Sequence, residues 1–390
     1  MAKLGEVCIQ ITDGSHNPPS GVEQSEYLML SSKNIDDDFI TLDSPRFLSH
    51  SDYIAENKRT TVSEGDLLMT IVGTIGRVAI VPKELKGICL QRSVAVIKPN
   101  KEIINNRYLM YQLQNMRSFL EKEARGVAQK GIYLKQVSQL DIKLPEIEQQ
   151  KQIVKVLDKV SKLISLRKQQ LAKLDELVKA RFVEMFGNPS NNSLGFPYEP
   201  LSNCLLSIEN GKSFVCSNDM RQEENPAILK LSAVTYGVYQ QDENKEILDS
   251  SMFVKSAEVH KGDLLFTRKN TPELVGMCAY VNDTAPNLMM PDLIFRLNTN
   301  EKINKIFLWK LINHEFFRGK IQNIATGSAK SMSNISKERL EKLAIILPPL
   351  HLQNDFAALV ERVDQQKQTV QQSLEKLELM KKALMQEYFG

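Results

Sequence analysis

The stretch that decides the fold is LPEIEQQKQIVKVLDKVSKLISLRKQQLAKLDELVKARFVEMFG, residues 144–187, which recurs as LPPLHLQNDFAALVERVDQQKQTVQQSLEKLELMKKALMQEYFG at residues 347–390. The two copies align over 44 positions without a gap, and 13 of these positions are identical. Such a repeat, with a similar length of chain before each copy, predicts a duplicated architecture.

Each copy has the pattern of one long helix. A proline stands near the start, at Pro145 and Pro348, and in the first copy no further proline or glycine occurs before Gly187. The apolar spacing alternates between four and three, which is typical of a coiled-coil seam; it is seen at Ile153, Leu157, Val160, Ile164 and at Phe356, Val360, Val363. At about 1.5 Å per residue each helix is roughly 60 Å long, too long to bury its seam against one globular unit. Because the chain must return, we expect the helices to pack as an antiparallel coiled coil with pseudo-twofold symmetry.

Four seam positions carry a cation in one copy and an apolar residue in the other, in the pairs Ile164/Lys367, Arg167/Val370, Val178/Lys381 and Arg181/Leu384. Such positions either form polar layers that fix the register of the two helices, or lie at the edge of the seam with their stems reaching outward. The sequence leaves both readings open.

The segment before each helix repeats as well. EGDLLMT at residues 64–70 recurs as KGDLLFT at residues 261–267. Short β-rich runs are predicted at residues 67–72, 78–81, 94–97, 264–267, 277–281 and 293–297, with one helical stretch per copy at 108–123 and 307–321. The expected fold is α+β, with mostly-β domains at residues 1–143 and 201–345, long helices at 144–187 and 346–390, and a linker at 188–200.

Composition and charge narrow the class of protein. The chain has 390 residues and a net charge of +3, with no apolar run long enough for a membrane span and no signal-peptide pattern. Its five cysteines are scattered, so we expect reduced thiols in a cytoplasmic protein without a zinc site. Residues 1–143 carry 18 basic and 17 acidic groups, and residues 188–345 carry 18 of each. Any attraction of this chain alone for DNA phosphates should be modest.

The order of these motifs, found twice at near-constant spacing, resembles one known family. The residues that carry the resemblance are ITDGSH at 11–16, GDLL at 65–68, GTIGRVA at 73–79, LP at 144–145 with QQKQI at 149–153, and residues 182–189. Over essentially its whole length the chain resembles the specificity subunit of type I restriction–modification systems. Two departures stand out: the chain begins directly at the first recognition domain, and residues 267–274 replace the first copy's glycine loop with three extra residues.

The resemblance implies two target-recognition domains, each reading one half of an asymmetric, bipartite site in double-stranded DNA. It implies helices that set the spacer between the half-sites and dock two adenine-methyltransferase subunits, which restriction subunits then join. S-adenosylmethionine, ATP and Mg²⁺ are expected on those partners. This chain itself is expected to bind no cofactor or metal and to be non-catalytic.

Two apparent catalytic motifs fail on their residues. Asn17-Pro18-Pro19-Ser20 has serine where an amino-methyltransferase needs an aromatic residue to stack on the flipped base. Gly211-Lys212-Ser213 lacks the preceding glycine of a phosphate loop, because Leu206 stands there.

Candidate DNA readers are the polar residues of the predicted loops, since Arg, Lys, Asn and Gln read base edges while Ser and Thr bind phosphates. They are Ser15, His16, Asn17, Thr74, Arg77, Gln91, Arg92, Arg125, Gln129 and Lys130 in the first domain, and Lys212, Ser213, Arg268, Lys269, Asn270, Thr271, Lys330 and Ser331 in the second. Because Gln91-Arg92 corresponds to Pro291-Asp292, the two domains should read different bases.

Candidate partner-binding residues lie on the helices. They are Lys151 and Lys155, from a lysine stripe that continues to Lys159 and Lys162, and the apolar helix ends Phe182, Met185, Phe186, Met385, Tyr388 and Phe389, which we expect to be exposed. The stripe is either a solvated face or a contact with a modification subunit or with DNA phosphates.

Two other functions remain open from these residues. One is the specificity subunit of a type IIB-like or phage-defence methyltransferase complex, and the other is a coiled-coil scaffold that does not read DNA. Neither the recognised bases nor the spacer length follows from the sequence.

Overall fold

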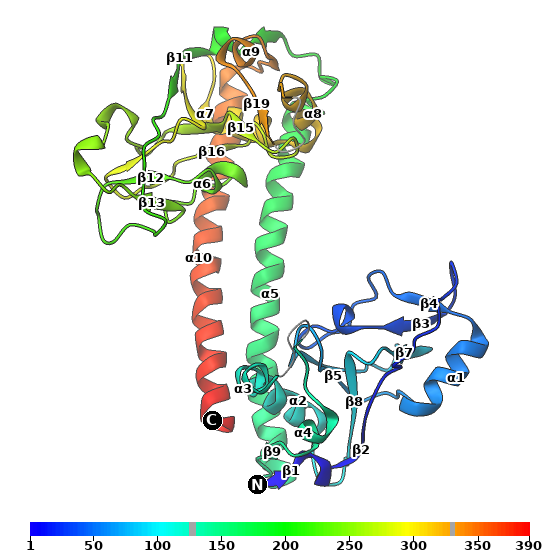
Figure 1. Ribbon diagram of the computed structural model, residues 1–390. Helices are drawn as coiled ribbons and strands as arrows, with labels where there is room; N and C mark the ends of the chain where they lie inside the picture. The colour runs from blue at the N-terminus through cyan, green and yellow to red at the C-terminus, as the bar shows by residue number, and fades with distance from the viewer. Residues whose placement is uncertain (125–129, 328–331) are drawn as a thin grey trace. The chain divides into compact units, whose positions relative to one another are not determined.

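The computed structural model describes residues 1–124, 130–327 and 332–390. The chain divides into two compact units, unit 1 (Met1–Lys168 with Gln372–Gly390) and unit 2 (Gln169–Gln371). Each unit contains one globular head and segments of both long helices, coloured from blue to red along the chain in Figure 1. Head 1 precedes the first long helix, and head 2 lies between the two helices.

Head 1 is built on small sheets. An antiparallel four-stranded sheet has the order β2–β8–β5–β6, and a three-stranded sheet has the order β4–β3–β7, in which β3 and β7 are parallel. The first and last strands of the head, β1 and β9, pair with each other. The bounds are β1 Ala2–Lys3, β2 Cys8–Asp13, β3 Tyr27–Leu30, β4 Arg46–Leu48, β5 Leu67–Thr70, β6 Val78–Ile80, β7 Ile88–Leu90, β8 Val94–Pro99 and β9 Asp141–Ile142.

Head 2 repeats this topology strand for strand. Its four-stranded sheet has the order β11–β18–β14–β16, its three-stranded sheet is β13–β12–β17, and β10 pairs with β20. A further pair, β15–β19, corresponds in head 1 to a single antiparallel bridge between Val72 and Gly131. The bounds are β10 Tyr198–Pro200, β11 Leu205–Asn210, β12 Ala227–Leu229, β13 Asn244–Glu246, β14 Leu264–Thr267, β15 Lys269–Asn270, β16 Cys278–Tyr280, β17 Leu288–Met289, β18 Ile294–Thr299, β19 Ser333–Asn334 and β20 Ala344–Ile346. The end of the predicted linker, Tyr198–Pro200, therefore belongs to head 2.

Both heads are built on small sheets, and each also contains four α-helices among its described residues, more than the one helical stretch expected. They are α1 His50–Thr60, α2 Asn106–Asn115, α3 Arg117–Glu123 and α4 Leu134–Ser138 in head 1, and α6 Ser232–Thr235, α7 Lys305–Asn313, α8 Glu315–Asn323 and α9 Lys337–Glu341 in head 2. Helix α1 has no apolar periodicity because most of its residues are polar; it packs through Tyr53, whose ring stacks on Tyr27 with centroids 4.6 Å apart. Each predicted helical stretch is two helices, and the second breaks at His314, where the backbone is extended.

The long helices are α5 (Ile147–Phe186) and α10 (Leu350–Phe389). The start of each is fixed to its head by a buried glutamine. The Gln150 side chain accepts a hydrogen bond from the backbone N–H of Asn105 (2.8 Å) and donates to the carbonyls of Ile103 and Pro145. In unit 2, Gln353 accepts a hydrogen bond from the backbone N–H of Asn304 (2.9 Å) and donates to the carbonyls of Lys302 and Pro348. Asn105 and Asn304 in turn cap α2 and α7, so the glutamine joins two helix starts.

The far end of each long helix lies in the hydrophobic core of the other head. In unit 2, Phe182 and Phe186 of α5 pack against Phe307 of α7 and Phe356 of α10, with ring centroids 4.8–5.9 Å apart. In unit 1, Phe389 of α10 packs on Tyr108 (5.2 Å), among the buried residues of head 1. Burial of one such aromatic side chain stabilises the fold by roughly 1.5–3 kcal/mol.

Within each unit the two helix segments are in contact. Lys168 pairs with Glu378 (3.0 Å) in unit 1, and Asp175 pairs with Lys367 (2.6 Å) in unit 2. Lys367 thus forms a polar contact across the helix pair, as the polar-layer reading predicts. Lys381 instead reaches head 1, where its Nζ lies 3.6 Å from Asp38 and above the Tyr111 ring.

All five cysteines are free thiols. Burial raises the pKa of the Cys8 and Cys89 thiols to about 12, so these two stay protonated near neutral pH. Within the described residues, no helix is both long and apolar enough to cross a bilayer.

The hydrogen bonds of Gln150 and Gln353, which we call the glutamine clamp, generate a prediction. Gln150→Leu should lower the free energy of unfolding by about 1–3 kcal/mol, because the Asn105 N–H and two carbonyls lose their partner while buried. Urea unfolding followed by circular dichroism measures the change. The neighbouring exposed Gln149→Leu is the matched control and should change the free energy by less than about 0.5 kcal/mol. Equal effects of the two substitutions would contradict the clamp.

Candidate nucleic-acid interface

The loops predicted to read DNA in head 1 meet at one end of its four-stranded sheet. After β2, the backbone N–H of Ser15 donates to the Leu90 carbonyl (2.7 Å), and the N–H of Arg92 donates to the Ser15 carbonyl (2.9 Å). These bonds place His16 and Asn17 beside the Gln91-Arg92 turn that precedes β8. The side chains of His16, Asn17 and Arg92 are exposed.

A third and a fourth loop join at the same place. The backbone N–H of Ile71, at the end of β5, donates to the Ser93 carbonyl (2.9 Å), next to Arg92. The N–H of Gly73 donates to the Lys130 carbonyl (3.3 Å), so Thr74 and Lys130, both exposed, lie at this end too. The structure therefore brings together four loops whose residue numbers run from 15 to 130.

Close backbone approach makes this arrangement possible. A Cβ on Gly14 would collide with the Leu90 carbonyl, and a Cβ on the repeat-equivalent Gly211 would collide with the carbonyls of Met290 and Pro291. Only glycine fits at either position, which explains why both copies keep it between the strand and the loop.

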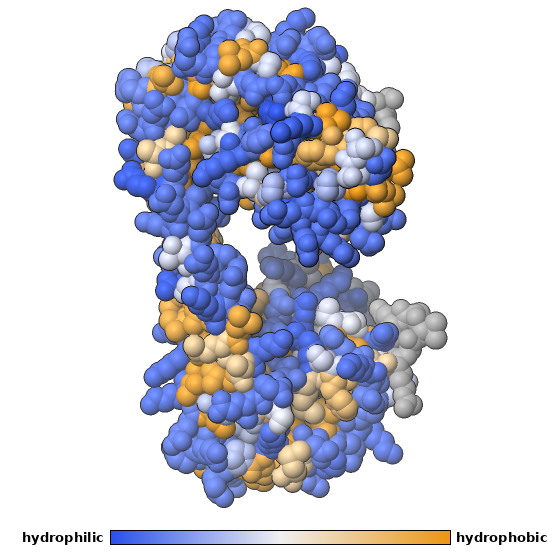
Figure 2. Space-filling model, turned by 90° about the vertical axis from the view of Figure 1, so that its left-hand side faces the viewer, coloured by the Kyte–Doolittle hydropathy of each residue, from blue (hydrophilic) through white to orange (hydrophobic). Residues whose placement is uncertain are grey.

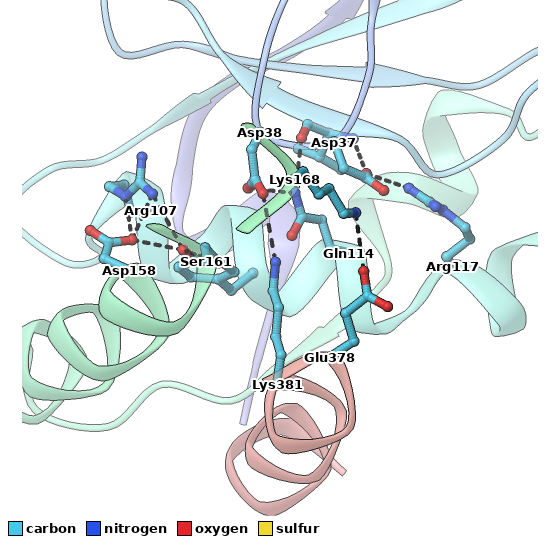
Figure 3. Close-up of polar contacts among 12 residues, drawn as sticks. Asp37, Asp38, Arg107, Gln114, Arg117, Asp158, Ser161, Lys168, Glu378 and Lys381 are labelled. Carbon is cyan, nitrogen blue, oxygen red and sulfur yellow. Dashed lines mark hydrogen bonds and ion pairs between the residues drawn. The ribbon is translucent and has the colours of Figure 1, made fainter. Parts of the chain in front are cut away.

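Arg77 lies apart from this group. Its guanidinium pairs with Asp36 (2.7 Å), and the adjacent Arg117 pairs with Asp37 and donates to the Gly76 carbonyl. Figure 3 shows Arg117 turned toward Asp37, beside Asp38 and Gln114. Arg117 thus joins the glycine loop to α3, and Arg77 would have to give up its ion pair with Asp36 to reach DNA.

Sequence reasoning missed a charged cluster under the reading loops. Asp13, only 7% exposed, accepts from His16 Nε2 (2.8 Å) and pairs with Arg59 of α1. Arg59 Nε also donates to the Asp13 carbonyl (3.1 Å). The cluster orients the exposed His16 ring and places a further guanidinium near the loops. No local signal reveals it, because Arg59 is 46 residues from Asp13 and lies on a helix without apolar periodicity.

The corresponding loops of head 2 meet in the same way but carry different chemistry. The N–H of Lys212 donates to the Met290 carbonyl (2.9 Å), and the N–H of Arg268 donates to the Leu293 carbonyl (3.0 Å). Ser213 donates to Asp292 (2.6 Å), the residue that corresponds to Arg92. Head 2 thus presents an acidic residue where head 1 presents a guanidinium.

Asn270 is a correction to the predicted readers. It is buried in β15, and its amide donates to the Thr235 hydroxyl (3.1 Å), so it is unavailable to a ligand. The three extra residues of this segment accompany a strand pair, β15–β19, rather than an open loop. Lys269 lies on the same strand, Thr271 is half-buried beside it, and the Arg268 guanidinium lies over the Phe295 ring (5.1 Å). Arg125, Gln129, Lys330 and Ser331 lie outside the described residues.

The apolar helix ends are a second correction. Phe182, Phe186, Met385 and Phe389 are buried, and Met185 and Tyr388 pack against the same cores. The expectation that they form an exposed docking surface is wrong, because these side chains complete the cores of the heads. Lys151 and Lys155, in contrast, are exposed.

Unit 2 contains a cavity of about 530 Å³ between head 2 and the helix segments, where Lys310, Asp364 and Lys367 meet the ring of Trp309. The Lys310 ammonium lies 3.4 Å from the centre of that ring. Burial lowers the pKa of Lys310 to about 8, and burial raises the pKa of Asp364. Among the described residues, no group of three or more His, Cys, Asp or Glu side chains is arranged to hold a metal ion.

Known proteins share both the sequence pattern and the fold. The family described as "Type I restriction modification DNA specificity domain" matches residues 29–176 and again 205–379. The MjaVIII type I specificity subunit of Methanocaldococcus jannaschii is 25% identical over 84% of this chain and 79% of its own length. The EcoEI specificity subunit of Escherichia coli is 27% identical over 47% of this chain, but that alignment spans only 33% of the relative.

Two solved structures have the same fold. The S subunit of a type I restriction–modification system from M. genitalium superposes with a TM-score of 0.58, at 11% identity, over 100% of this chain and 95% of that chain. A chain from a structural study of complex assembly and conformational transition of the type I R-M system superposes with a TM-score of 0.54, at 18% identity, over 100% and 96%.

The cavity in unit 2 generates a prediction. Because the pKa of Lys310 is about 8, about half of its amines are uncharged at pH 8, against under about 1% for an ordinary surface lysine. An amine acylating reagent should therefore label Lys310 many-fold faster than the exposed Lys173 between pH 7 and 9. Peptide mass spectrometry measures both rates, and Lys310→Arg removes the label while keeping a cation. Labelling that follows Lys173 at every pH would contradict the lowered pKa.

Proposed function

Because this chain belongs to the family of type I restriction–modification DNA specificity domains, we propose that it is the subunit that selects the DNA site of such a complex. The observation that carries the proposal is the duplication: one recognition fold occurs twice, each copy with its own set of converging loops and its own helix. Two similar heads with different loop chemistry suit a site whose two halves differ in sequence.

Each head reads one half of the site in this proposal. In head 1 the readers are the exposed residues at the shared end of the sheet, His16, Asn17, Thr74, Arg92 and Lys130. In head 2 they are Lys212, Ser213 and Lys269, with Arg268 beside them. Arginine and lysine recognise guanine edges, asparagine recognises adenine, and hydroxyls position phosphates. The change from Arg92 to Asp292 accounts for different base preferences.

The two long helices form an antiparallel coiled coil that sets the spacer and docks two adenine-methyltransferase subunits. The ion pairs Lys168–Glu378 and Asp175–Lys367 support an antiparallel pairing within each unit. Catalysis, with S-adenosylmethionine, ATP and Mg²⁺, takes place on the methyltransferase and restriction subunits. The near-neutral heads leave most phosphate contacts to those partners.

An exchange of heads tests the function. Replacement of residues 188–347 by the second head of another family member keeps the β10–β20 pair intact and should change only one half of the methylated site. Sequencing of modified bases in cells that carry the chain with its methyltransferase subunit measures this. The reciprocal exchange of residues 1–143 should change only the other half. Methylation that is unaltered by either exchange would exclude site selection by this chain, as a mere scaffold predicts.

A single-residue prediction concerns Arg92. Arg92→Ala should weaken specific DNA binding by the assembled methyltransferase about 10–100-fold and relax base preference in the head-1 half-site only, since one exposed guanidinium is lost. Competition binding with single-base variants of the site measures both effects. Lys86→Ala is the control, because Lys86 is exposed but lies before β7, whereas Arg92 follows that strand. An equal loss with Lys86→Ala would indicate a general charge effect.

A further inference from the structure

The start of α5 carries a concentrated basic surface in unit 1. Lys151, Lys155, Lys159 and Lys162 are all exposed and lie on one face of the helix, at spacings of four, four and three residues. They border a hollow of about 440 Å³ whose other walls are Asn105, Val154 and Asp158. We call these four lysines the lysine stripe.

The charge of the lysine stripe is neutralised only in part from within the unit. Asp158, the carboxylate in the hollow, accepts hydrogen bonds from Arg107 Nε (2.8 Å) and from the Tyr111 hydroxyl (2.7 Å). Figure 3 shows it turned toward Arg107. Lys151 pairs with Glu148 (3.1 Å). The other three lysines of the stripe form no ion pair with any residue in the described ranges.

An exposed apolar strip runs beside the lysines. Val156, Leu163 and Leu166 are 38%, 46% and 48% exposed, and at 100° per residue they lie within about 80° of one another on the helix. Exposed hydrophobic residues also occur elsewhere on the surface, as Figure 2 shows for the side of the molecule that it views. Apolar side chains edged by lysines are the complement of an amphipathic helix that has acidic residues along one edge.

Comparison with α10 shows that a long helix forms without the lysine stripe and the apolar strip. At the equivalent positions of α10, displaced by 203, the lysine stripe is replaced by Asn354, Ala358, Arg362 and Gln365. The apolar strip is replaced by Leu359, Gln366 and Thr369. The long helix therefore forms without these residues, and at these positions the second copy keeps one of the four positive charges, Arg362, and one of the three apolar side chains, Leu359.

Location favours a protein partner over DNA. The hollow lies beside Asn105, which follows the carboxyl end of β8, whereas the reading turn at Gln91-Arg92 precedes the amino end of that strand. β8 has six residues, so about 20 Å of strand separates the two places.

We propose that the lysine stripe and the adjoining apolar strip dock an acidic-edged amphipathic helix of one methyltransferase subunit, and that the repeat-equivalent start of α10 offers no such surface. This inference rests on the proposed function and adds to it that the two docking faces differ. One methyltransferase subunit binds unit 1 through charge and apolar contact, while the other uses a face with few lysines.

The test compares matched triple substitutions at repeat-equivalent, exposed positions. Lys155→Glu/Lys159→Glu/Lys162→Glu should weaken binding of the purified adenine-methyltransferase subunit about tenfold or more in about 0.1 M salt. Ala358→Glu/Arg362→Glu/Gln365→Glu should change it less than about threefold. The charge-conserving Lys→Arg triple should bind as the unaltered chain does. The difference should shrink in about 1 M salt, where the screening length falls to about 3 Å. Isothermal calorimetry with the full-length chain measures all four.

Other outcomes separate the possible failures. Equal binding by the two glutamate triples would overturn the asymmetric surface while leaving the proposed function intact. If methyltransferase binding were unchanged but the salt slope of DNA binding fell by about three, the lysines would contact phosphates and the proposal would fail. If the unaltered chain bound no methyltransferase subunit at all, the proposed function would fall together with this inference.

Discussion

A forty-residue helix with one apolar face has to bury that face against other parts of the chain along its whole length. The rest of this structure depends on which residues the face packs against. Neither head is large enough to bury a helix of roughly 60 Å. The start of each helix is held by a buried glutamine, and the end inserts aromatic side chains into a core built mainly from the other half of the chain. As a result each compact unit needs both helices, and neither repeat forms a complete unit from its own residues.

The two halves of the chain share the contacts that build each head, and they differ in the residues that each head exposes. The elements that close each head are shared: the strand order, the glycine that allows the loop to pass the neighbouring turn, and the glutamine clamp. Positions that face outward at the shared end of the sheet and along the helices differ in charge. Arg92 corresponds to Asp292, and the basic start of α5 corresponds to a segment of α10 without lysine, in which Asp355, Glu361 and Asp364 outnumber Arg362. A duplicated fold thus carries different chemistry in its two copies, as the proposed asymmetric DNA site and the two proposed docking faces require.

Charge illustrates how little the composition of a chain says about its surface. A net charge of +3 and nearly neutral heads conceal a concentrated cationic stripe and a buried lysine whose pKa is lowered. In the described structure most carboxylates near the helix–head contacts have a specific basic partner, such as Asp158 with Arg107 and Asp37 with Arg117. The unpaired lysines of the stripe are where we propose that a partner supplies the opposite charge.

The sequence by itself determined the tandem architecture, the two long helices and the main strands of the four-stranded sheets, because these follow from local periodicity and from self-similarity between the two halves. It also identified most of the loop residues that meet at the end of each sheet, although not that they meet. Only the tertiary structure decided which of them are available: Asn270 is buried in the strand pair β15–β19, Arg77 is engaged with Asp36, and Arg59 joins the site from a helix without apolar pattern. It also decided that Phe182, Phe186 and Phe389 belong to cores. An apolar residue at a helix end has the same local pattern whether it faces solvent or a head, and the difference depends on contacts with residues more than a hundred positions away.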